Sequence, residues 1–288
     1  MSYKFIFDTS VLDEKSVKEL RDAGIVNACS SGRFAFYATP ILLKERLNFA
    51  GKGKIHPNAV EPVKLLIDLK WQRLFNEFGG PEGIFTKELE GKSQSEYLFI
   101  PHREIKDNLA LFLKGGEFDD EAKQVIATDF SRWTEKKKNN KGIYRSMRQD
   151  IGEKIKKGKS TSRKGANFPA FLNINFKSMT IDKIKNSINS KISKDKLVEY
   201  WLSYKKRCPY FNKYVEGYLF IAWHIMASEL EPKIDTNAQD DIEHLLYLIG
   251  VDGIVSNETD FMSTACKQLF PEKNFLSVAQ LIRRLKNG

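Results

Sequence analysis

The sequence predicts an α/β protein with a small parallel sheet flanked by helices and a large, mainly α-helical insertion. Short apolar runs of strand type lie near both ends of the chain, and each precedes a segment with helical spacing. The long middle of the chain carries apolar residues mainly at helical spacing. We therefore expect residues 1–50 and 233–288 to form the sheet and residues 51–232 to form the insertion.

The N-terminal part opens with an apolar strand at residues 3–7 (YKFIF), which Asp8 follows directly. A polar helix is expected from about residue 13 to residue 23. An Asp between a strand and a helix is either a helix cap or a ligand. Residues 33–39 (RFAFYAT) alternate and are rich in aromatics, which predicts a second strand followed by a helix. Glu45 lies about one turn into that helix, as either a surface side chain paired with a cation or a site residue.

The middle of the chain shows helical spacing over most of its length and no internal repeat. Residues 82–101 contain short apolar runs flanked by Gly and Pro, which suggests a hairpin or loop. Helices are expected over residues 58–78, 104–113, 121–133, 178–192, 196–206 and 210–229.

The C-terminal part holds acidic residues among strongly apolar ones. A helix is expected over residues 238–249 and a strand over residues 252–255, with Ser256-Asn257 capping a second helix whose first turn is acidic. A strand that ends at an acidic turn places carboxylates at the carboxyl edge of the sheet, where open α/β sheets keep their sites. The chain closes with a strand at residues 274–276 and a basic helix at residues 279–286.

Three short motifs resemble those of PIN-domain nucleases. An apolar strand leads into Asp8-Thr9-Ser10, a second strand leads into Thr39-Pro40 with Glu45 five residues on, and Ser256 to Phe261 reads SNETDF. The resemblance covers residues 1–50 and 233–288 and implies a PIN-like core. It implies bound Mg²⁺ or Mn²⁺, for which carboxylate oxygens are suitable ligands. The implied metal ligands are Asp8, Glu45, Asp240, Asp241, Glu258 and Asp260.

The implied activity is hydrolysis of phosphodiester bonds by a metal-dependent nuclease. The resemblance favours an endonuclease that acts on RNA over one that acts on DNA. The implied catalytic acids are Asp8, Glu45, Asp241, Glu258 and Asp260. Asp240 is the neighbouring candidate to Asp241 on the same helix, and Glu258 stands where the family usually has Asp. Ser10 and Asn257 are candidates for orienting water on the metal, and Thr9 and Ser10 for holding the Asp8 carboxylate or a phosphate.

The positive charge of the chain is concentrated in residues 132–164. This segment has thirteen basic and three acidic side chains, a net charge of +10 that equals the formal net charge of the whole chain. A charge run is usually a solvated face, but basic residues interleaved with aromatics suit a phosphate backbone with stackable bases. The nucleic-acid-binding candidates are Lys136, Lys137, Lys138, Lys141, Arg145, Arg148, Lys156, Lys157, Arg163 and Lys164.

Three other functions fit the same sequence. A flap-endonuclease-like DNA nuclease also inserts basic helices between its acids, and a catalytically degenerate PIN-like module would bind nucleic acid without cleaving it. A helical interaction protein would use its acids only as caps. The resemblance also allows an antitoxin-type protein partner, because small bacterial PIN ribonucleases are often toxins.

Composition bounds the setting of the protein. The three cysteines are far apart and form neither a C-x-x-C pair nor a zinc spacing, which favours a reduced, cytoplasmic location. No apolar run approaches the roughly 20 residues needed to cross a bilayer, and the apolar run at the start is too short for a signal peptide. We therefore expect no membrane partner.

Overall fold

The computed structural model describes residues 2–39, 42, 60–69, 73–74, 81–92, 135, 138–146, 149, 167–227 and 237–287. The chain divides into two compact units, which are described separately. Unit 1 comprises Met1–Glu77, Ser95–Ser131 and Tyr247–Gly288, and unit 2 comprises Phe78–Gln94 and Arg132–Leu246.

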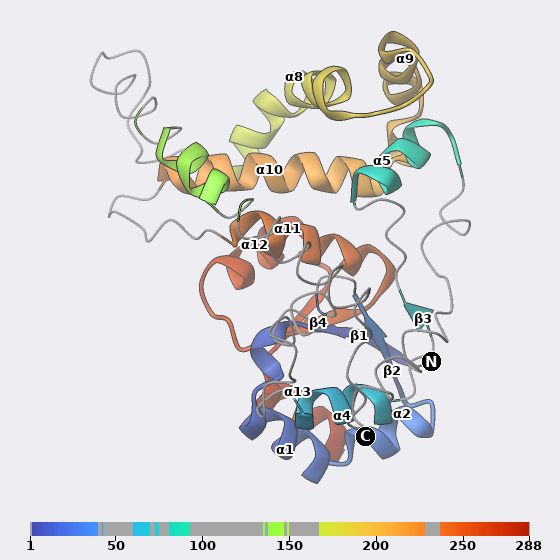
Figure 1. Cartoon of the computed structure of the whole chain (residues 1–288), viewed down its shortest axis with the longest axis vertical. Helices are drawn as coiled ribbons and strands as arrows, with labels where there is room; N and C mark the ends of the chain where they lie inside the picture. Colours follow the sequence, from blue (N-terminus) through green and yellow to red (C-terminus); the bar gives the residue numbers. More distant parts are fainter. Residues whose placement is uncertain are drawn as a thin grey trace, which may run out of the picture. The chain divides into compact units, whose positions relative to one another are not determined.

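Unit 1 is built on a five-stranded sheet in the order β3-β2-β1-β4-β5, with every neighbouring pair parallel (Figure 1). The coarse prediction of an α/β fold with a small parallel sheet is therefore confirmed. The strands are β1 (Tyr3–Phe7), β2 (Phe34–Ala38), β3 (Arg73–Leu74), β4 (Gly253–Val255) and β5 (Asn274–Leu276).

The strand order reverses direction at β1. The chain runs outward from β1 through β2 to β3, and β4 then returns to the other side of β1 with Phe7 level with Val255. A ligand-binding crevice in an open α/β sheet lies outside the carboxyl ends of the strands at such a switch point. The strand order thus identifies the ends of β1 and β4 as the place to look for a site.

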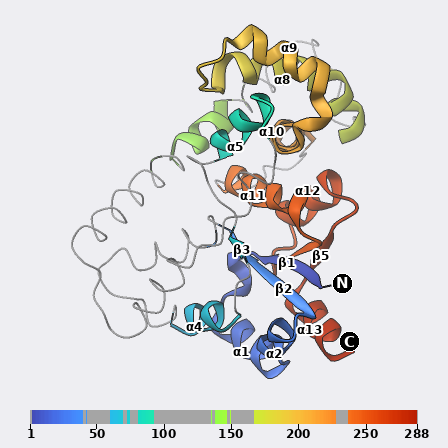
Figure 2. The same ribbon diagram turned by 90° about the vertical axis from the view of Figure 1, so that its right-hand side faces the viewer.

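Aromatic residues on alternate strand positions form the core on one face of the sheet. Phe5 and Phe7 of β1 pack with Phe36 of β2 at ring-centroid distances of 4.8 to 5.7 Å. Each side chain of this kind contributes about 1.5–3 kcal/mol when fully buried. The helices that cover this face are α1 (Glu14–Asp22), α2 (Ile25–Ser30), α4 (Val60–Asp68) and α13 (Val278–Asn287) (Figures 1 and 2).

The second face of the sheet is also buried. Ile6 of β1 and Ile254 of β4 have no exposed surface, and α12 (Phe261–Leu269) lies on this side (Figure 2). The first residue of β4 is glycine, because a Cβ at Gly253 would lie 2.5 Å from Tyr3 Oη and 2.7 Å from Asn274 O. Strands buried on both faces are typical of parallel sheets and explain their continuous apolar runs.

One expectation for unit 1 was partly wrong. Residues 58–78 were predicted as one helix, but α4 ends at Asp68 and β3 follows at Arg73. The buried residues of α4, among them Leu65 and Leu66, belong to the core cluster of the sheet. A two-residue strand is too short for period-2 alternation to register, so the apolar spacing of α4 dominated the sequence signal.

Unit 2 is helical in the part that the structure describes. Its longest helices, α8 (Phe168–Ser187) and α10 (Pro209–Ala227), pack against each other, with Phe168 and Phe220 at a centroid distance of 5.2 Å. Gly217 of α10 lets α11 approach, because a Cβ there would lie 2.2 Å from Ile242 Cγ2. Unit 2 also contains α5 (Pro81–Leu89), α9 (Lys194–Tyr204), α11 (Ala238–Leu245) and a helical stretch at residues 138–146.

The helix α5 replaces part of the hairpin or loop expected over residues 82–101. The Gly and Pro residues that flank the short apolar runs favoured a loop, but α5 begins at Pro81, and proline is well tolerated in the first turn of a helix. The helices predicted over residues 178–192, 196–206 and 210–229 are confirmed with shifted bounds. Those predicted over residues 104–113 and 121–133 lie outside the described residues. Among the described residues, no helix is long and apolar enough to span a membrane.

Candidate functional site

The carboxyl ends of β1 and β4 bring Asp8 and Ser256 together. Asp8 follows β1, and its backbone N–H donates to Val255 O at 2.9 Å. Ser256 follows β4 and donates from its own N–H to Leu276 O, also at 2.9 Å. Both side chains are buried, with exposed fractions of 6% for Asp8 and 1% for Ser256. A carboxylate and a hydroxyl thus meet at the topological switch point of the sheet.

Every described donor to the Asp8 carboxylate contacts the same oxygen. Oδ2 accepts from Ser256 Oγ at 2.8 Å, from Ser10 N at 3.3 Å and from Ser10 Oγ. No donor within the described ranges contacts Oδ1. Asp8 therefore caps the short 3-10 turn Thr9–Val11, whereas the N-cap of the following helix α1 is Asp13, so the expectation that Asp8 could cap that helix was wrong. The fixed carboxylate retains one oxygen with lone pairs available to a ligand.

The hydroxyl of Ser10 links Asp8 to the loop that follows β4. Ser10 Oγ accepts from Asn257 N at 3.0 Å and lies 3.2 Å from Ser256 Oγ. The expectation that Ser10 holds the Asp8 carboxylate is confirmed. The arrangement fixes the rotamer of Asp8 through two side-chain hydroxyls and one backbone amide.

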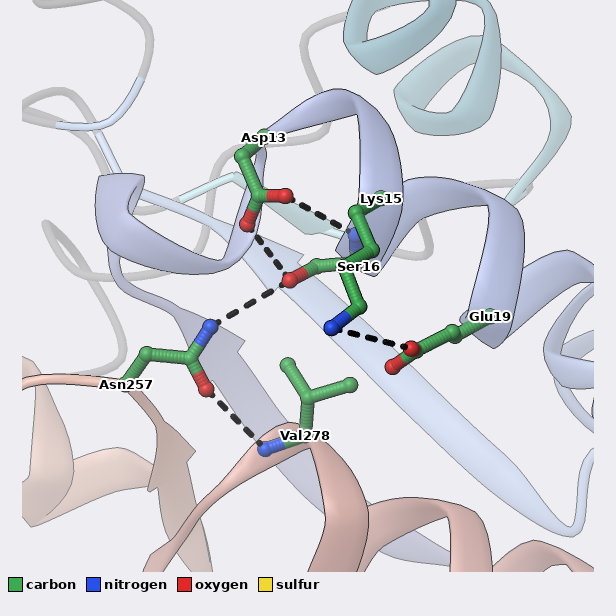
Figure 3. A network of polar contacts seen from close by, with 6 residues as sticks. All are labelled: Asp13, Lys15, Ser16, Glu19, Asn257 and Val278. Carbon is green, nitrogen blue, oxygen red and sulfur yellow. Dashed lines mark hydrogen bonds and ion pairs between the residues drawn. The ribbon is translucent and has the colours of Figure 1, made fainter.

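The side chain of Asn257 connects this loop with two helices (Figure 3). Its Nδ2 donates to Ser16 Oγ at 3.3 Å and to Ser10 O at 3.3 Å, and its Oδ1 accepts from Val278 N at 3.5 Å. Both polar atoms of the amide therefore have protein partners. These contacts give Asn257 a positioning role, and its expected role in orienting a water on the metal stays a prediction.

Asp13 holds the far end of the same network as the N-cap of α1. Its carboxylate accepts from Ser16 N at 3.0 Å and from Ser16 Oγ (Figure 3). Burial acts to raise the pKa of Asp13, but hydrogen bonds from Ser16 and from the backbone outweigh it, and the pKa lies below its usual value. Asp13 is thus held as an anion, which the N-terminus of α1 favours.

The acidic turn after β4 is arranged differently from the expectation. Glu258 accepts from Met262 N at 3.2 Å, which satisfies a backbone N–H in the first turn of α12. Asp260 is exposed and occupies the N-cap position of α12 without a side-chain cap hydrogen bond. The predicted cap at Ser256-Asn257 is wrong, because α12 begins at Phe261 and Ser256 instead donates to Asp8.

The positions of the remaining predicted ligands relative to Asp8 are not given by the structure. Asp240 and Asp241 stand in the first turn of α11 in unit 2, where Asp240 is buried and Asp241 is half-buried. Glu45 lies outside the described residues. Among the residues that are described, no three Asp, Glu, His or Cys side chains form a group that could hold a metal ion. The part of unit 1 that is described therefore supplies Asp8 as an anchored carboxylate, with Glu258 and Asp260 on the next loop.

Part of the basic segment is helical and presents its charge outward. Residues 138–146 are helical, and Lys138, Lys141 and Arg145 are exposed. Their spacing of three and four places them on one face of the helix, whereas Asn140 and Tyr144 are buried. The other basic candidates, Lys136, Lys137, Arg148, Lys156, Lys157, Arg163 and Lys164, lie outside the described residues.

Sequence reasoning missed the role of Ser256 as a partner of Asp8. The two residues are 248 positions apart, and only the parallel register of β1 and β4, with Phe7 level with Val255, shows that the residues after the two strands lie side by side. The available signal was that both strands end in a hydroxyl-rich or acidic turn.

Comparisons with protein-family models, with curated proteins and with solved structures found no match for this chain.

Proposed function

We propose that this protein is a metal-dependent nuclease that hydrolyses phosphodiester bonds, with RNA as its substrate. The observation that carries the proposal is the Asp8 carboxylate, which is buried at the switch point of the sheet with Oδ2 held by Ser10 and Ser256. Among the described residues, no donor contacts its other oxygen, Oδ1. Hydrogen bonds compensate one oxygen, and a divalent cation is suited to the other.

The donor set is made of hard oxygen ligands. Asp8 would bind Mg²⁺ or Mn²⁺ together with Glu258 or Asp260 from the neighbouring loop. Glu45 and Asp241, with Asp240 beside it, are the further candidates from the resemblance. A bound divalent cation lowers the pKa of a coordinated water and stabilises the leaving oxygen of a phosphodiester. Ser10 and Ser256 contribute by holding Asp8 in one rotamer.

The charge distribution supports a polyanionic substrate. Carboxylates repel phosphates, so an acidic site needs positive surface elsewhere to attract a nucleic acid. The exposed face of Lys138, Lys141 and Arg145 supplies such a surface. The formal net charge of +10 at pH 7 favours association with nucleic acid in general.

A binding module without catalysis is the second candidate. It is favoured by the lack of any three-ligand group among the described acids and by the use of Glu258 as a helix cap. Such a module would bind RNA with a strong salt dependence and would not need a divalent ion. The two candidates therefore differ in their response to metal removal.

The test is cleavage of an end-labelled single-stranded RNA with Mg²⁺ or Mn²⁺ present and with EDTA added. We expect cleavage that EDTA abolishes and that Asp8→Asn lowers by at least about 100-fold, since it removes a proposed metal ligand. Asp195→Asn, at an exposed position on α9, is the matched control and should cleave normally. Cleavage that survives both EDTA and Asp8→Asn would contradict the proposal, and binding without any cleavage would favour the module.

A comparison of two further variants assigns the loop acids. Glu258→Gln and Asp260→Asn each remove one charge from the loop after β4. The variant that raises the Mn²⁺ concentration needed for half-maximal cleavage identifies the ligand. Glu258 also accepts a hydrogen bond from the first turn of α12. The unfolding curve of the Glu258→Gln variant should therefore be measured together with its cleavage activity, so that loss of this cap is separated from loss of the metal.

A further inference from the structure

The turn that joins α9 to α10 presents a cluster of cations beside an aromatic ring. Lys205, Lys206 and Arg207 form one 3-10 turn, η4 (Lys205–Arg207), and all three side chains are exposed. Tyr204 precedes them and is 48% exposed. Within the described part of the chain, no carboxylate forms an ion pair with these three cations. We call residues 204–207 the Tyr204–Arg207 turn.

Hydrogen bonds to residues of α10 and to Cys208 hold the backbone of this turn in place. Lys205 O accepts from Cys208 N at 3.1 Å and from Asn212 Nδ2 at 2.7 Å. Asn212 Oδ1 in turn accepts from Trp201 Nε1 at 2.8 Å, and both Trp201 and Cys208 are buried. The exposed cations therefore project from a fixed support, which lowers the entropy lost when they bind a ligand.

The side chain of Arg207 is itself oriented. Its Cζ lies over the ring of Tyr204 at 5.1 Å from the centroid, and that ring is 5.1 Å from the ring of Tyr200. A guanidinium stacked on an aromatic face keeps its N–H groups directed outward in a planar fork that matches a phosphate. Tyr200 and Tyr204 thus arrange Arg207 for phosphate recognition.

A purely structural explanation covers only part of this arrangement. Cations after the C-terminus of α9 interact favourably with the helix dipole. One cation in the last turn would satisfy that role, and the effect falls off within one turn. Three adjacent cations, one of them stacked on a half-exposed tyrosine, go beyond it.

We propose that the Tyr204–Arg207 turn is a contact site for the phosphate backbone of a single-stranded nucleic acid, separate from residues 132–164. The three cations bind phosphates, and the stacked Tyr204–Arg207 pair offers planar surface to a base. This inference rests on the proposed nucleic-acid substrate, but it requires no catalysis. An anionic membrane is disfavoured because Leu202 is the one exposed aliphatic side chain beside the turn, whereas a membrane-surface helix presents a broad apolar face.

The test measures the equilibrium binding of the full-length chain to a labelled single-stranded RNA of mixed sequence, in EDTA and at several salt concentrations. The slope of log K against log salt is about −0.7 per neutralised phosphate for single strands. The triple variant Lys205→Gln, Lys206→Gln, Arg207→Gln should therefore have a slope smaller in magnitude by about 2. The control triple Lys177→Gln, Lys185→Gln, Lys191→Gln removes the same charge from exposed sites of unit 2 and should change the slope by less than half as much.

Two single variants test the aromatic contribution. Tyr204→Ala should weaken RNA binding several-fold, whereas Tyr204→Phe keeps the ring and should bind as the wild type does. Thermal unfolding of each variant shows that the fold is retained. The inference is overturned if the two triple variants give the same slope, if the wild-type chain does not bind RNA, or if it binds phosphatidylserine vesicles more tightly than RNA.

The outcomes separate this inference from the proposed nuclease activity. A reduced slope in the triple variant, without any RNA cleavage by the wild type, would support the contact site and contradict the proposed nuclease activity. RNA cleavage that depends on Asp8, together with an unchanged slope in the triple variant, would support the proposed nuclease activity and contradict the contact site.

Discussion

The hydroxyl of Ser256 joins the two strands on either side of the switch point. It donates to Asp8 Oδ2 at 2.8 Å and accepts from Glu258 N at 3.0 Å, while its own surface is almost fully buried. Removing such a hydroxyl leaves a buried carboxylate with one donor fewer and a half-buried amide without its acceptor. The position thus combines a structural role with control of the Asp8 rotamer.

We predict that Ser256→Ala lowers the free energy of unfolding by about 1–3 kcal/mol, because it leaves buried polar groups unsatisfied. The measurement is urea unfolding followed by circular dichroism. Ser203→Ala removes an exposed hydroxyl on α9 and serves as the control. A loss at Ser256 no greater than that at Ser203 would show that the network does not hold the fold.

A pH-dependent contribution to stability is predicted for Asp13. Its pKa in the folded protein lies below the usual value, because hydrogen bonds from Ser16 and the backbone outweigh the effect of burial. The stabilising effect of the charge is therefore complete above the unfolded pKa of about 3.9 and is lost as the pH falls through the lower folded value.

Asp13→Asn keeps a side chain that can cap α1 but removes the charge. We expect it to be less stable than the wild type at pH 6, with the difference shrinking as the pH falls below about 4. Urea unfolding at several pH values measures this. A difference that stays constant down to pH values below the folded pKa would contradict a charged cap.

At the scale of elements, α10 begins against a buried carboxylate from α5. Glu88 has no exposed surface and accepts from Tyr210 N at 3.1 Å and from Phe211 N at 2.8 Å. These amides belong to the first turn of α10, where backbone N–H groups have no acceptor within the helix. The positive end of the helix dipole also favours a negative charge at this place. Burial and, secondly, the charge of Glu88 raise the pKa of the Cys208 thiol to about 12.

We predict that Glu88→Gln destabilises the protein by about 1.5–3 kcal/mol, the usual contribution of hydrogen bonds to a charged group. The readout is the urea midpoint. Glu90→Gln is the control, since Glu90 is half-buried and accepts from Ser190 Oγ at 2.8 Å. Equal losses in the two variants would show that the cap on α10 has no special weight.

The strands show which elements can be predicted from sequence. Strands β1, β2, β4 and β5 were expected within one or two residues of their bounds, because each is a short apolar run between polar or Gly-containing turns. The strand β3 was missed because two residues carry no periodicity. The helix α5 was missed because the Gly and Pro residues that flank the short apolar runs were interpreted as turn signals.

At the scale of the whole molecule, the candidate site was predictable only in part. The sequence indicates that Asp8 follows a strand, but its partner Ser256 depends on strand register, which local patterns do not encode. The use of Glu258 as a cap depends on where α12 begins, and helix boundaries are the least predictable feature of an element. The acids Asp240 and Asp241 lie in unit 2, and their approach to Asp8 is a prediction.

The central claim is that Asp8 binds a divalent cation together with acids from other parts of the chain. The most direct test is a crystal structure of the full-length protein soaked with Mn²⁺, located by its anomalous signal. We predict one Mn²⁺ at about 2.0–2.3 Å from Asp8 Oδ1, with at least two further ligands from Glu45, Asp240, Asp241, Glu258 and Asp260. A structure without Mn²⁺ at Asp8, or with Asp8 more than about 10 Å from both Asp241 and Asp260, would contradict the claim.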